Sequence, residues 1–104
     1  MTLLDMIIKE YIFIVEALAQ DEAIENGRIV INRERFKAIL EKYGYMTFSQ
    51  KTKVYKALNF IIHDKNNYTM PCKDRVLNKT VRMVAINYNT YETVKKLYET
   101  TVNL

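Results

Sequence analysis

The sequence has few of the residues that most often carry chemistry. Its 104 residues include one cysteine, one histidine, two glycines and no tryptophan. The single cysteine, Cys72, excludes an intramolecular disulfide and predicts a reduced, cytoplasmic compartment. Two glycines are too few for a glycine-rich loop of the kind that holds phosphate groups. We therefore expect no bound cofactor.

The same scarcity argues against catalysis and metal binding. A zinc site built on His63 and Cys72 would need carboxylates to complete it, and no acidic residues have suitable spacing. Composition leaves a Cys–His nucleophilic pair open, but a histidine at a helix end beside a strand cysteine is more often structural. We expect no catalytic residues and no metal ligands, and so a protein that is not an enzyme.

Long hydrophobic segments are missing as well. The longest unbroken apolar run in the first predicted helix covers residues 11–15 and lies between Glu10 and Glu16. A bilayer-spanning helix needs about 20 such residues, so we expect no membrane association. We find no signal peptide, repeat or linker, and the length favours one domain over residues 1–104.

Positive charge is concentrated in the middle of the chain. The formal net charge is +4, but residues 1–27 carry one lysine and six acidic residues, a net −5. Residues 28–88 carry thirteen lysines or arginines and four acidic residues, a net +9, and residues 89–104 balance. This asymmetry favours a polyanionic partner for the middle, with nucleic acid first. The alternative is a basic surface that only contacts solvent.

The first predicted helix covers residues 3–25 and ends at Asn26 and Gly27, because glycine readily adopts the left-handed conformation after a helix. It has more apolar surface than one small core can cover. We expect a homodimer through residues 1–25, alone or with residues 89–102. The alternative is that a later helix covers the surplus. The predicted interface residues are Leu4, Ile7, Ile8, Tyr11, Phe13 and Ile14.

Two further helices follow a short strand. Three consecutive β-branched residues predict a strand over residues 28–32, and Asn32 is a suitable cap for a helix over residues 33–43. A third helix is predicted over residues 47–63, with an apolar face that continues to its end. That face consists of Val54, Leu58, Ile61 and Ile62, and the opposite side of Lys53, Lys56 and Asn59.

The last part of the chain predicts a hairpin and a final helix. Residues 68–72 look extended, and residues 80–88 alternate in the manner of a strand. The loop between them is polar. Asn89 and Glu92 have the spacing of a capping box, which predicts a helix beginning after Asn89.

This order of elements, together with the segment KVYKAL at residues 53–58, resembles the winged helix-turn-helix over residues 5–88. The implied fold class is α+β, mostly α, with an added C-terminal helix. The resemblance implies that the third helix lies in the DNA major groove, that the hairpin, or wing, contacts flanking backbone or minor groove, and that the protein is a dimer.

A small basic winged helix rich in Lys, Asn, Ile and Tyr also resembles accessory proteins of low-GC Gram-positive plasmids. That resemblance implies a homodimer that binds a specific double-stranded DNA site, such as an origin of transfer, and marks it for a relaxosome or another nucleoprotein complex in conjugation. A transcriptional repressor and a plasmid partition protein are alternatives in the same class. A protein–protein adaptor is the alternative from another class.

The candidate DNA-binding residues lie on the third helix and the wing. Lysine contacts phosphates, whereas arginine can read base edges, and arginine is absent from the predicted helix. We therefore expect the wing to contribute as much recognition as the helix, or alternatively to contact backbone only. The candidates are Ser49, Gln50, Lys51, Lys53, Lys56, Asn59, Lys73, Arg75, Asn78, Lys79 and Arg82.

Overall fold

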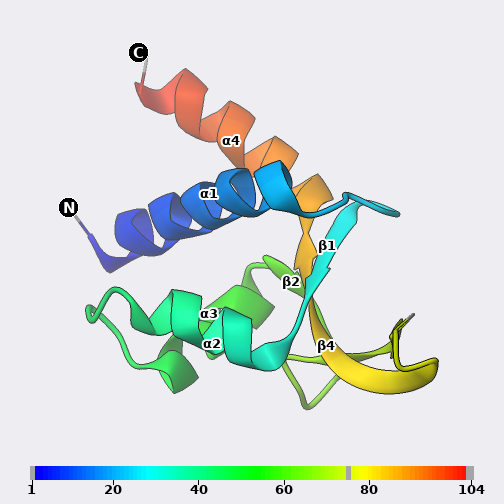
Figure 1. The fold of residues 1–104 in the computed structure, drawn as a ribbon. Helices are drawn as coiled ribbons and strands as arrows, with labels where there is room; N and C mark the ends of the chain where they lie inside the picture. Colours follow the sequence, from blue (N-terminus) through cyan, green and yellow to red (C-terminus); the bar gives the residue numbers. More distant parts are fainter. Residues whose placement is uncertain (1, 75, 103–104) are drawn as a thin grey trace.

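The computed structural model describes residues 2–74 and 76–102, which form helices around a small antiparallel sheet (Figure 1). The fold is α+β and has the winged helix-turn-helix arrangement followed by a C-terminal helix, as the sequence predicts. The elements are α1 (Leu3–Asp21), β1 (Arg28–Ile31), α2 (Arg33–Glu41), α3 (Phe48–Ala57), β2 (Ile61–Ile62), β3 (Met70–Asp74), β4 (Lys79–Asn87) and α4 (Tyr88–Val102).

Strand β4 is the centre of the sheet. Its second half pairs with β1 and β2, in the order β1-β4-β2, so that Ile86 lies opposite both Ile29 and Ile61. Its first half pairs only with β3, and this hairpin is the wing. In Figure 1 the wing extends away from the helices, while α4 begins directly where β4 ends.

The core lies between helices α1, α2 and α3 and one face of the sheet. Tyr11 of α1 stacks on Phe60 with ring centroids 3.9 Å apart, and Tyr55 of α3 meets both rings edge-on. Burying a large apolar side chain contributes about 1.5–3 kcal/mol, so this aromatic cluster is a major part of the stability. Ile7, Tyr11 and Ile14 belong to this core. Their predicted place in a dimer interface is therefore wrong.

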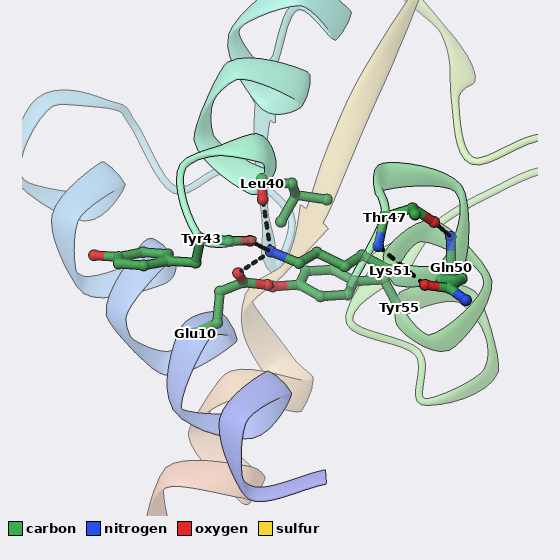
Figure 2. Close-up of polar contacts among 7 residues, drawn as sticks. All are labelled: Glu10, Leu40, Tyr43, Thr47, Gln50, Lys51 and Tyr55. Carbon is green, nitrogen blue, oxygen red and sulfur yellow. Dashed lines mark hydrogen bonds and ion pairs between the residues drawn. The ribbon is translucent and has the colours of Figure 1, made fainter. Parts of the chain in front are cut away.

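A buried ion pair joins the first three helices (Figure 2). Lys51 of α3 is fully buried, and its ammonium group donates to Glu10 Oε2 of α1 at 2.7 Å. It also donates to the carbonyl oxygens of Leu40 at 2.6 Å and Tyr43 at 2.7 Å. Tyr55 donates to the other oxygen of Glu10 at 2.8 Å. All three donors of the lysine are used, and α2's last turn gains a cap.

The third helix is shorter than predicted. It ends at Ala57, and Asn59 adopts a left-handed backbone with φ of 58°. Asparagine tolerates that conformation better than most residues, so the chain turns there. Ile61 and Ile62 then form β2 instead of a helical face. The apolar residues at helical spacing therefore belong to two different elements, α3 and β2, that pack against the same core.

The other boundaries also shift. Helix α1 ends at Asp21, four residues early, and Asn26 and Gly27, both with positive φ, form a tight turn closed by the Glu25–Arg28 bridge. A Cβ atom at position 27 would clash with the Asn89 side chain, so glycine fits this turn. Helix α4 is capped by Asn87, whose side chain accepts from the Thr90 N–H, so the predicted Asn89 cap is wrong.

We expect Lys51→Ala to lower the free energy of unfolding by about 3–5 kcal/mol, because it leaves the Glu10 carboxylate buried without its counterion. Lys53→Ala is the matched control, since it removes an exposed lysine from the same helix and should change stability by less than about 0.5 kcal/mol. Urea unfolding followed by circular dichroism measures both. Equal stability of the two variants would contradict a structural role for Lys51.

We also expect stability to fall in alkali. Burial first, and then the nearby Glu10 carboxylate, raise the pKa of Tyr55 well above its ordinary value of 10.0. Above pH 10 the unfolded chain loses this phenolic proton while the folded chain keeps it, so the free energy of unfolding decreases as pH rises. Tyr55→Phe should flatten this decrease, and the exposed Tyr43→Phe should not. A stability independent of pH between 9 and 11 would be inconsistent with this burial.

Candidate nucleic-acid interface

Helix α3 presents a polar face that leads away from the core. Ser49, Gln50 and Lys53 are exposed, and Lys56 is half-buried one turn later. Thr47 and Gln50 form a capping box, in which Gln50 Oε1 accepts from the Thr47 N–H at 3.0 Å. Because its oxygen is used locally, Gln50 retains its amide nitrogen as the group that can contact a ligand.

Lys51 does not belong to this face. Its predicted role in DNA binding is wrong, because its side chain is fully buried against Glu10 and α2. Its ammonium also lies 4.2 Å from the ring centroid of Tyr45, a favourable cation–π distance. The sequence places Lys51 and Lys53 two residues apart, on nearly opposite sides of α3. Asn59 is exposed, in the turn after the helix.

The wing carries a second set of the predicted residues. Lys73 of β3, Asn78 in the turn and Lys79 of β4 are exposed. Asp74 Oδ1 accepts from the N–H groups of Val76 at 2.9 Å and Leu77 at 3.1 Å, which shapes the wing tip. Arg75 was also a candidate, but it lies outside the described residues.

Arg82 is held by contacts within the chain. Its guanidinium pairs with the Asp64 carboxylate and donates to Thr69 Oγ1 at 2.8 Å and to the Thr69 carbonyl at 2.8 Å. These contacts tie β4 to the loop before β3. A two-pronged contact to a base edge would require Arg82 to give up some of these bonds, so its geometry favours a role in positioning the wing over the predicted role in reading bases.

Several exposed side chains near these residues were not among the candidates. Val76 at the wing tip is 93% exposed and Leu77 is 57% exposed, although apolar side chains rarely extend so far into solvent. No periodic pattern marks them, because they lie in a turn. Other exposed basic residues signalled only by charge are Arg33, Lys37, Lys42 and Lys65.

Ion pairs among the described residues neutralise carboxylates on and next to α1, but they leave the exposed lysines of the α3 face and the wing unpaired. Two carboxylates of α1 and one at its C-cap are paired with cations: Glu10 with Lys51, Glu16 with Lys95 of α4, and Glu22 with Arg35. The lysine lowers the pKa of Glu16, whereas burial and that same carboxylate raise the pKa of Tyr91 to about 12. By contrast, within residues 2–74 and 76–102 no salt bridge involves the exposed lysines of the α3 face or the wing.

Other kinds of site find little support in the described part of the chain. There, no group of three or more histidine, cysteine or acidic side chains could hold a metal ion. None of the described helices combines the length and apolarity needed to cross a membrane. The sequence matches no protein-family model, and no curated protein is significantly similar to it.

We expect Arg82→Ala and Asp64→Ala to have the same effect on the wing. Each removes one side of the ion pair that ties β4 to the loop before β3, so amide hydrogen exchange in β3 should accelerate in both variants. Lys79→Ala is the control within the wing, since Lys79 is exposed, and it should leave the exchange unchanged. Faster exchange in neither variant would show that Arg82 does not brace the wing.

Proposed function

We propose that the protein binds double-stranded DNA through the exposed face of α3 and the wing. The observation that carries this proposal is the distribution of unpaired cations on a winged-helix fold. Lys53 of α3 and Lys73 and Lys79 of the wing are exposed and form no salt bridge within the described residues. Phosphate contacts need such accessible charges.

The two parts would have different tasks. A helix of the length of α3 fits the DNA major groove, where the amide nitrogen of Gln50 can donate to the N7 of a purine and Ser49 can contact several bases. The wing lysines would hold the flanking phosphates. Exposed Val76 and Leu77 suit the apolar contacts that proteins make in the minor groove. In this division the helix reads bases and the wing positions the protein.

We further propose that binding marks a DNA site for other proteins in the cytoplasm, such as an origin of transfer on a plasmid. The support is the resemblance of this small basic winged helix to plasmid accessory proteins. Selecting bound duplexes from a random pool and sequencing them tests for a specific site. No enrichment, together with capture of a protein partner by this face, would instead favour the adaptor alternative.

We expect Lys53→Ala and Lys79→Ala each to weaken binding to all duplexes. Each should also flatten the dependence of log K on log salt concentration by about one unit, because one phosphate contact is lost. Fluorescence anisotropy over a salt series measures this. Lys96→Ala is the matched control, since it removes an exposed lysine from α4. An equal change in the control would place the DNA elsewhere on the molecule.

Gln50→Ala should instead reduce the preference for the selected site over a scrambled duplex, with little change in the salt slope, because an amide reads bases without releasing counterions. Competition between the two duplexes at fixed salt separates these effects. A Gln50→Ala variant that keeps full preference would contradict base reading by α3.

A further inference from the structure

Helix α1 carries a second stripe on the side that faces away from the core. Its positions follow alternating steps of three and four residues, which is the spacing by which one helix packs along another. Every member is exposed or lines a surface hollow. The stripe consists of Leu3, Met6, Glu10, Phe13, Ala17 and Gln20.

The only charged member of the stripe is neutralised inside the protein. Glu10 is 6% exposed, and its two carboxylate oxygens accept from Lys51 and Tyr55. The centre of the stripe therefore presents no free charge. A neighbouring helix could cover this position without desolvating an unpaired carboxylate.

A hollow and a projecting ring lie side by side on this surface. Phe13 is 59% exposed and Tyr43 is 44% exposed. Next to them is a mostly apolar hollow of about 400 Å³, lined by Met6, Lys9, Glu10, Phe13, Tyr43 and Tyr45. A second hollow of about 240 Å³ lies on the other side of the same two aromatic residues.

We infer that this surface binds a second copy of the chain, with the two α1 helices packed antiparallel about a two-fold axis. A two-fold interface uses the same patch twice, so the patch must contain both the projecting group and the cavity that receives it. Phe13 and the hollow beside it satisfy that condition. An unrelated partner would require only one of them.

The spacing of the stripe fixes the register. If the axis passes between positions 10 and 13, Phe13 of the partner subunit lies over Glu10 and enters the larger hollow. Met6 then lies opposite Ala17 of the partner subunit, a large side chain against a small one. Each pair occurs twice, as two-fold symmetry requires. This arrangement uses residues outside the proposed DNA-binding face and does not depend on DNA binding.

Sedimentation equilibrium at micromolar concentration tests the association. The wild-type chain should have twice its mass of 12.4 kDa, and Phe13→Asp should raise the dissociation constant of the dimer at least about 30-fold. Because Phe13 is exposed, the variant should keep the wild-type circular dichroism spectrum. Val76→Asp, a similar change at the wing tip, is the control and should leave the dimer intact.

Cysteine cross-linking tests the register. In a Cys72→Ser background, the double variant Met6→Cys/Ala17→Cys should form a covalent dimer on mild oxidation, and neither single variant should do so. The two positions are eleven residues apart on one helix, about 16 Å, so they cannot bond within one chain.

Three results would overturn the inference. The first is a wild-type monomer at micromolar concentration, and the second is a Phe13→Asp variant that still dimerises. The third is covalent dimer formation by Met6→Cys alone, which would indicate parallel helices. Because these experiments contain no DNA, their outcome is separate from that of the DNA-binding experiments.

Discussion

The contact between Lys51 and Glu10 determines how the first three helices fit together. One ammonium group from α3 meets a carboxylate of α1 and two carbonyl groups at the end of α2. The lysine therefore joins three separate parts of the chain. Its displacement would leave Glu10 Oε2 and the buried Leu40 carbonyl oxygen without this donor, while Glu10 Oε1 would keep its hydrogen bond from Tyr55. The angle between α2 and α3, which sets the exposed face of α3, is therefore coupled to the position of α1. The acidic helix α1 and the basic helix α3 are joined by this internal ion pair.

Much of the fold was predictable because its signals are local. Asn32 caps α2, the β-branched residues form β1, and the alternation in β4 identifies a strand. Hydrophobic periodicity predicted the wrong element boundary where two elements contribute to the same apolar face. Ile61 and Ile62 continue the helical spacing of Val54, but they belong to β2. The chain leaves the helix through a left-handed turn at Asn59, which costs little energy and does not change the spacing of the apolar residues.

The candidate site was less predictable than the fold, since charge does not say where a side chain lies. Lys51 and Lys53 have the same side chain, but one is enclosed and the other is exposed, and the difference depends on Glu10, which is 41 residues away from Lys51. Similarly, Arg82 is engaged by Asp64 and Thr69. Long-range partners of this kind cannot be inferred from spacing along one element. The outward-facing stripe of α1 becomes identifiable only once Ile7, Tyr11 and Ile14 are known to face the core.

The pairing partners of β4 change between Met83 and Val84, which divides the strand into two halves. Residues after this point have β1 or both β1 and β2 beside them and contribute Val84, Ala85 and Ile86 to the interior, whereas residues before it pair with β3 alone. Substitutions in the second half therefore disturb the interior, while those in the first half alter only a hairpin. Evolution can thus change the length and composition of the wing, and with it the ligand contacted, without repacking the helices.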